Sequence, residues 1–71
     1  MNDEFVLSVL RSRGPMTVRQ IVAAYGMVAN NTNLGKVRRQ MKSMCRYGLV
    51  REVGTVRDGT YHPSILWAVI G

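Results

Sequence analysis

Apolar residues recur at helical spacing between residues 33 and 47, and this pattern constrains the fold more than any other stretch of the chain. The intervals of three and four residues predict a helix that buries one stripe of side chains. That stripe consists of Leu34, Val37, Met41, Met44 and Cys45. Because a helix turns by about 100° per residue, polar residues occupy the opposite face and its flanks. On the opposite face are Gly35, Lys36, Arg39, Ser43 and Arg46, and on the flanks are Gln40 and Lys42.

The same stretch holds half of the chain's ten lysine and arginine residues, and it holds no acid. Its cations are Lys36, Arg38, Arg39, Lys42 and Arg46. Surface helices usually mix charges, because a glutamate and a lysine four residues apart attract each other. A basic face is sometimes only a solvated face, but the repulsion between like charges is relieved when a polyanion binds. We therefore expect this helix to contact a polyanion.

The composition favours one globular domain over residues 1–71. At this length about 60% of the unfolded surface is buried on folding, so a few large side chains must supply the core. The sequence is 46% apolar, enough for a globular fold and too much for a disordered tail. The net charge of +6 and the pI near 10.5 are typical of domains that bind nucleic acid.

Cysteine content and hydropathy indicate the compartment. The single cysteine, Cys45, has no partner for an internal disulfide, and its place on the apolar stripe predicts a buried side chain. No charged-then-apolar leader opens the sequence, and the longest apolar run, residues 65–70, is too short to span a bilayer. We therefore expect a cytoplasmic protein that does not enter a membrane.

Local signals predict a first helix over about residues 3–13. Asn2 is a good N-cap, acids follow it in the first turn, and Gly14-Pro15 stops the helix. Leu7 falls outside the apolar stripe of this helix. It is expected to be either a lone exposed leucine or a subunit contact.

Capping residues place the other two helices. Thr17 and Gln20 form a capping box at the start of a helix over about residues 18–25. The connection that follows is rich in asparagine, a cap and turn former, so the third helix should begin at Thr32 or the next residue and cover 33–47.

After the third helix the apolar period changes from 3.6 to 2, which predicts a C-terminal hairpin. Its strands should cover about residues 49–56 and 60–70, with Asp58-Gly59 as a two-residue turn. Gly54 should interrupt the first strand, and Pro63 should break or bulge the second. The half that begins at Ser64 should pair with residues 49–53 and bring Trp67, the largest side chain available, into the core.

This order of elements resembles the winged helix-turn-helix family. The likeness is carried by TVRQIVAAYG (residues 17–26) and VRRQMKSMCRYGLV (residues 37–50), and it covers nearly the whole chain. The resemblance implies a small α+β fold in which three helices precede a β-hairpin wing. It also implies duplex DNA binding by a small transcriptional regulator, although the fold itself hosts DNA, RNA and protein binders alike.

The resemblance implies a set of binding residues. The third helix would enter the major groove, where Arg39, Ser43 and Arg46 would contact base edges. Gly35 and Lys36 at the helix start would lie against phosphate. The remaining predicted contacts come from the helix flanks, the second helix and the wing tip, namely Gln40, Lys42, Arg19 and Arg57.

Two arginines have alternative interpretations. Arg57 is as well explained as a solvated turn residue paired with Asp58 as by contact with a minor groove or phosphate. Arg38 lies close to the apolar stripe, so we expect it to pack its stem on the core and to pair with Glu52 rather than contact bases.

Other functions have less support in the sequence. His62 is the single histidine and the four acids form no spaced pair, so neither an enzyme nor a metal or cofactor site is expected. A protein-interaction module could use apolar surface at Leu7, Met27 and Val28. Structured RNA would suit the charge equally well. One domain of this size buries too little surface for tight specific DNA binding, which leaves room for a homodimer or a larger assembly.

Overall fold

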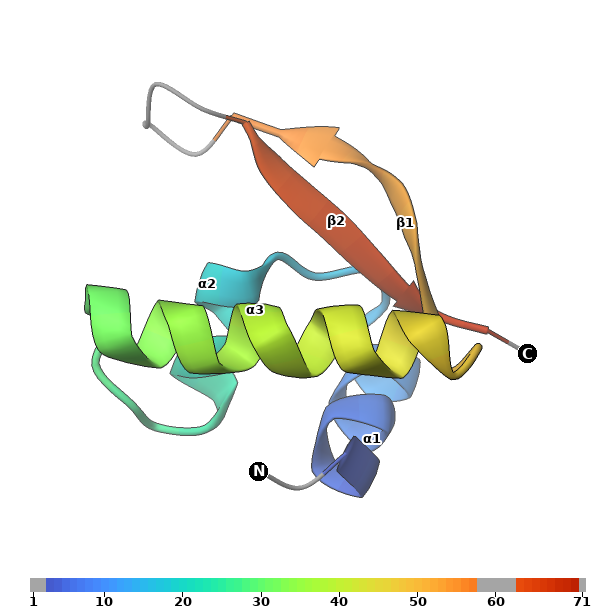
Figure 1. Cartoon of the computed structure of the whole chain (residues 1–71), viewed down its shortest axis with the longest axis horizontal. Helices are drawn as coiled ribbons and strands as arrows, with labels where there is room; N and C mark the ends of the chain where they lie inside the picture. Colours follow the sequence, from blue (N-terminus) through green and yellow to red (C-terminus); the bar gives the residue numbers. More distant parts are fainter. Residues whose placement is uncertain (1–2, 58–62, 71) are drawn as a thin grey trace.

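A computed structural model describes residues 3–57 and 63–70 of the chain, and in this part three helices precede a two-stranded antiparallel hairpin (Figure 1). The elements are α1 (Asp3–Arg13), α2 (Val18–Ala24), α3 (Asn31–Arg46), β1 (Val50–Val56) and β2 (Ser64–Val69). The predicted α+β domain with a C-terminal hairpin is therefore confirmed at the level of its elements and their order.

The third helix begins earlier than the sequence pattern predicted. It starts at Asn31, and Asn30 is its N-cap, with a side-chain oxygen that accepts a hydrogen bond of 2.8 Å from the backbone N–H of Asn33. The start expected at Thr32 or Asn33 was wrong because the first asparagine of the polar run, and not a later residue, supplies the cap. The extra residues lengthen the part of α3 that is exposed to solvent.

The capping box predicted at the start of α2 is confirmed. The backbone N–H of Gln20 donates to Thr17 Oγ1 at 3.2 Å, and the backbone N–H of Thr17 donates to Gln20 Oε1 at 2.9 Å. At the other end, Gly26 has a φ of 76°, a left-handed conformation that glycine adopts without steric cost. These signals fix α2 as a helix of two turns.

The hairpin contains a bulge where the sequence predicted an interruption. Glu52 pairs with Trp67 and Gly54 with Leu66, so Val53 has no partner across the ladder. The bulge is next to Gly54, and a bulge of this kind increases the local right-handed twist of its strand. The predicted turn at Asp58-Gly59 and the start of the return strand near residue 60 lie outside the described residues, as does the predicted cap Asn2.

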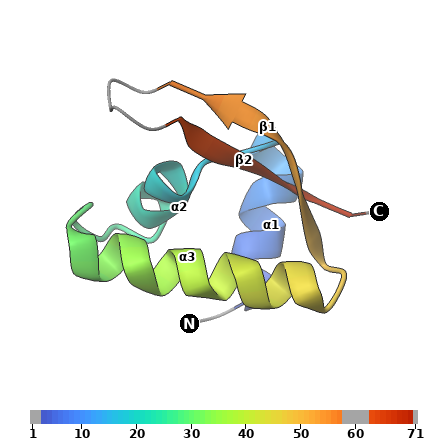
Figure 2. The ribbon, with the colours of Figure 1, turned by 45° about the horizontal axis from the view of Figure 1, so that its top comes forward.

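A short pairing ties the helices to the hairpin. Met16, between α1 and α2, forms an isolated antiparallel bridge with Trp67 of β2. The backbone N–H of Met16 donates to the Trp67 carbonyl at 2.9 Å, and the backbone N–H of Trp67 donates to the Met16 carbonyl at 2.8 Å. The edge of β2 away from β1 is therefore in part covered. In Figure 2, α2 lies between α3 and the hairpin.

One apolar cluster joins all of the elements. Trp67 is its largest member and is only 2% exposed. The other buried apolar residues are Val6, Leu10, Met16, Ile21, Val22, Val37, Met41, Met44 and Val50. Burial of side chains of this size contributes about 1.5–3 kcal/mol each before the loss of conformational entropy is counted.

Two predictions about apolar side chains were wrong. Cys45 is exposed, because on the helix it lies about 70° away from the line formed by the buried residues Val37, Met41 and Met44. Leu7, expected at the surface, is partly buried and packs against the core cluster.

Substitution of two valines of β1, Val50 and Val53, tests where the hairpin contacts the core. Val50 is fully buried, whereas Val53 at the bulge is 41% exposed. We expect Val50→Ala to lower the free energy of unfolding by about 2 kcal/mol, because it removes two buried carbon atoms and leaves a cavity. The matched control, Val53→Ala, should cost less than about 1 kcal/mol. Urea denaturation measures both, and equal losses would contradict this placement of the core.

Candidate nucleic-acid interface

Burial on one side of α3 determines which residues lie on its other side. Val37, Met41 and Met44 are fully buried or nearly so, and together they define the inward direction of the helix. By helical geometry, Arg39 and Arg46 lie within about 15° of the opposite direction and Gly35 within about 30°. We call these three positions the outward line. Both of its arginines are exposed.

All five cations of α3 are exposed. Within the part of the chain that the structure describes, no ion pair joins any of them to an acid. Two of the chain's acids, Asp3 and Glu4, lie in the first turn of α1, and Glu52 lies on β1. The positive charge of α3 is therefore not neutralised by the described residues.

Arg38 does not take the role that the sequence predicted. It is exposed, and it forms no ion pair with Glu52, which is also exposed. Arg38 lies about 90° from the outward line, on the same edge of α3 as Lys42 four residues later. The four-residue spacing of Arg38 and Lys42, about one helical turn, already indicated that the two side chains lie on the same edge of the helix.

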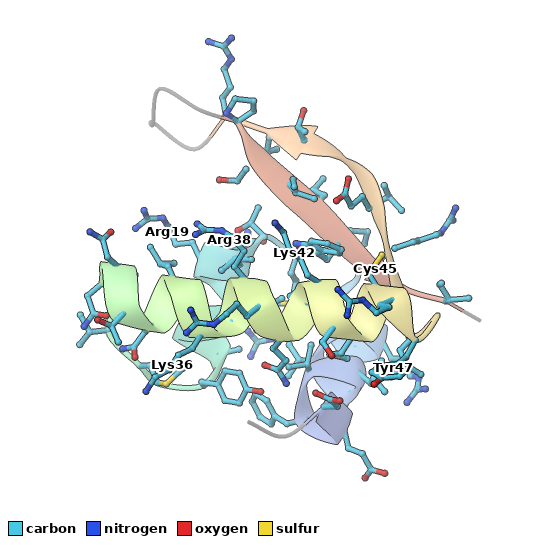
Figure 3. The ribbon with its side chains drawn as sticks, in the orientation of Figure 1. Arg19, Lys36, Arg38, Lys42, Cys45 and Tyr47 are labelled. Atoms are coloured by element: carbon cyan, nitrogen blue, oxygen red, sulfur yellow. The ribbon has the colours of Figure 1, made fainter. Side chains whose placement is uncertain are left out.

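Side chains on the two edges of α3 point in opposite directions. Arg38, Lys42 and Cys45 lie on the edge that faces the hairpin, and Arg19 of α2 points to the same side (Figure 3). We call Arg19, Arg38 and Lys42 the hairpin-side cations. Lys36 and Tyr47 lie along the other edge of α3 in the same view. The contact of Lys36 with phosphate stays a prediction, and the structure places Lys36 on the edge of α3 away from the hairpin-side cations.

Gln40 connects α3 to both of the other helices. The Tyr25 hydroxyl donates to Gln40 Oε1 at 3.3 Å, and Gln40 Nε2 donates to Asp3 Oδ1 at 2.9 Å. The Tyr25 ring also stacks on Phe5 of α1, with 4.6 Å between ring centroids. Because its amide is hydrogen-bonded within the chain, Gln40 holds α3 against the other two helices and is not proposed as a DNA contact.

Gly35 is a glycine that the fold does not require. It lies inside α3, and its φ is not in the left-handed region. A Cβ atom built at this position meets no atom of the described chain within 4 Å. A glycine inside a helix costs about 1 kcal/mol relative to alanine, so its presence on the outward line favours close approach of another molecule.

The remaining predicted contacts are also at the surface. Ser43 is exposed on α3, Arg19 is exposed in the first turn of α2, and Arg57 is exposed just after β1. The alternative pairing of Arg57 with Asp58 lies outside the described residues. The place of Arg57 in the interface stays a prediction.

The apolar surface predicted for a protein-interaction module is exposed only in part, and other apolar side chains are exposed elsewhere. Leu7 and Met27 pack against the core, whereas Val28 is 72% exposed. Other large exposed apolar side chains are Tyr47, Leu49, Val53, Val56 and Ile70.

Comparison of the chain with protein-family models, curated proteins and solved structures gives no match. Among the described residues, no group of three or more histidine, cysteine, aspartate or glutamate side chains could hold a metal ion. No helix in the same residues has the length and hydrophobicity needed to cross a membrane.

Gly35→Ala is expected to stabilise the isolated chain. Alanine is the better helix former and its methyl group would meet open space, so the free energy of unfolding should rise by about 0.5–1 kcal/mol. Gly48→Ala is the matched control and should destabilise, because Gly48 has a φ of 77°. Thermal unfolding measures both. A loss of stability in Gly35→Ala would mean that the fold itself needs this glycine.

Proposed function

We propose that this chain is a winged helix-turn-helix domain that binds duplex DNA, with α3 in the major groove and the hairpin as a wing beside the backbone. One observation carries the proposal: five exposed cations lie on α3 and none has an acidic partner in the described chain. The order of the elements and the pairing of Met16 with Trp67 support the winged-helix assignment. As a small DNA-binding domain, the protein would act as a transcriptional regulator.

The dimensions of α3 suit B-form DNA better than structured RNA. Its 16 residues give a rod about 24 Å long. The major groove of B-DNA is about 12 Å wide and admits an α-helix. The major groove of A-form RNA is deep and narrow, and side chains do not reach its bases. A helix with its cations on the solvent side therefore favours duplex DNA over duplex RNA.

The two sets of cations have different roles in this proposal. The outward line faces the floor of the groove, so Arg39 and Arg46 contact base edges, while Gly35 lets the helix backbone approach closely. The hairpin-side cations contact phosphates of the DNA strand that runs between α3 and the wing. Lys36, on the other edge, is at the rim of the interface. Arg57 extends the phosphate contacts if the hairpin lies on the same duplex.

The double variant Arg39→Ala/Arg46→Ala tests the central role of the outward line. We expect its affinity for a short mixed-sequence duplex at low salt to fall by about 10-fold or more, because two charges and their base contacts are lost. Arg11→Ala/Arg13→Ala removes the same charge from the end of α1 and serves as the matched control. It should change the affinity by less than about 3-fold. Fluorescence anisotropy with a labelled duplex measures both.

Equal losses in the two double variants would mean that binding depends only on net charge, and the proposed docking of α3 would be wrong. Unchanged binding in the α3 variant would also contradict the proposal. Circular dichroism of each variant establishes that the helices are retained.

Lys42 and Lys36 form a matched pair that tests which edge of α3 faces the backbone. Both are exposed lysines on one helix, but they lie on opposite edges. We expect Lys42→Ala to reduce the slope of log affinity against log salt by about one, as the loss of one phosphate contact requires. Lys36→Ala should leave the slope nearly unchanged. The reverse result would place the duplex on the edge away from the hairpin.

A protein-interaction module is the second candidate, and the exposed apolar side chains of the hairpin favour it. Val53 and Val56 on β1 and Ile70 after β2 are each at least 40% exposed. A partner bound through these residues would remain bound at high salt, because burial of apolar surface is not screened by ions. Duplex binding through the cations of α3 would be lost under the same conditions. Pull-down at low and high salt separates the two functions.

A further inference from the structure

Arg39 and Arg46 have almost the same direction on α3. They are seven residues apart, which is nearly two turns, so their directions differ by about 20° and their positions along the axis by about 10 Å. Both are exposed and neither has an acidic partner among the described residues. Two guanidinium groups are thus presented in line on the side of α3 that lies farthest from the core.

The residues between these arginines do not share that direction. By helical geometry, Lys42 and Ser43 each lie about 50° from the outward line, on opposite sides of it. Lys42 is on the side that faces the hairpin (Figure 3). A helix whose outward line faces the floor of the groove would bring the two arginines closest to the base pairs. Lys42 and Ser43 would lie to either side of the base pair between them.

The spacing of the arginines corresponds to a defined number of base pairs. In C2H2 zinc fingers, helix residues three positions apart contact successive bases when the helix lies in the major groove. At about three residues per base, a separation of seven residues spans about two base-pair steps. Arg39 and Arg46 would then face the first and third base pairs of a triplet.

We propose, resting on the proposed function, that α3 selects duplexes in which two guanines are separated by one base pair. Arginine donates two hydrogen bonds to the O6 and N7 acceptors of guanine, a pattern that no other base offers in the major groove. The middle base pair has no residue of the outward line opposite it and is weakly specified. The preferred triplet is therefore G-N-G, with Arg39 and Arg46 each responsible for one guanine.

Selection of bound sequences from randomised duplexes by the full 71-residue chain tests this proposal. The enriched duplexes should share two guanines one base pair apart. Replacing either G·C pair by A·T in the selected duplex should weaken binding by about 5- to 150-fold, the range expected for one bidentate contact. Replacing the middle pair should have less effect than replacing either guanine.

Single variants assign each guanine to its arginine. Arg39→Lys should retain binding at low salt but lose the preference at one guanine position, because lysine keeps the charge without the planar pair of donors. Arg46→Lys should lose the preference at the other position. Loss of preference at both positions in one variant, or at neither, would overturn the assignment. Thermal unfolding of each variant establishes that it is folded under the binding conditions.

The selection separates the failure of this inference from that of the proposed function. If a duplex is bound through Arg39 and Arg46 but the selected sequences lack the two guanines, the G-N-G proposal is overturned and DNA binding stands. If no duplex is bound at low salt, both are overturned.

Discussion

The burial of Val37, Met41 and Met44 in the common core is the constraint on which the proposed function depends. These three residues set the rotation of α3 about its own axis. That rotation determines the direction in which each cation of the helix points. The hydrogen bonds from Tyr25 to Gln40 and from Gln40 to Asp3 hold the same rotation from the side of α1 and α2. A helix fixed in this way presents Arg39 and Arg46 to solvent, so the proposed contact with DNA would need no rearrangement of the chain.

Trp67 has a corresponding role for the hairpin. Its side chain fills the core, and its backbone pairs with Met16 on one side and with Glu52 on the other. One residue thus connects the segment before α2 to both strands. The hairpin and α2 are held in one unit with α3, so the hairpin-side cations from two helices, Arg19, Arg38 and Lys42, point to one side. In so small a domain, such shared residues must replace a larger core.

Most of the fold could be predicted because its signals are local. The capping box at Thr17, the apolar repeat of α3 and the change of period after Gly48 each act within a few residues. Three features could not be predicted, namely the start of α3, the exposure of Cys45 and the burial of Leu7. They depend on which of several possible residues caps the helix or enters the core, and the tertiary structure decides this. The same holds for the site: the basic helix was evident, but the exposure of Arg38 and the use of Gln40 within the chain required the packing of all three helices. The winged-helix family, the contact with DNA and the role of Arg57 stay predictions.

The most direct measurement is the mapping of duplex binding on the chain by NMR. Backbone amide resonances of the 15N-labelled protein would be followed as a short duplex is added at low salt. We predict the largest shifts at Gly35, Arg39 and Arg46 and smaller ones at Arg19 and Lys42, with α1 nearly unchanged. Shifts confined to α1 or to the exposed apolar residues of the hairpin, or no shifts at all, would contradict it.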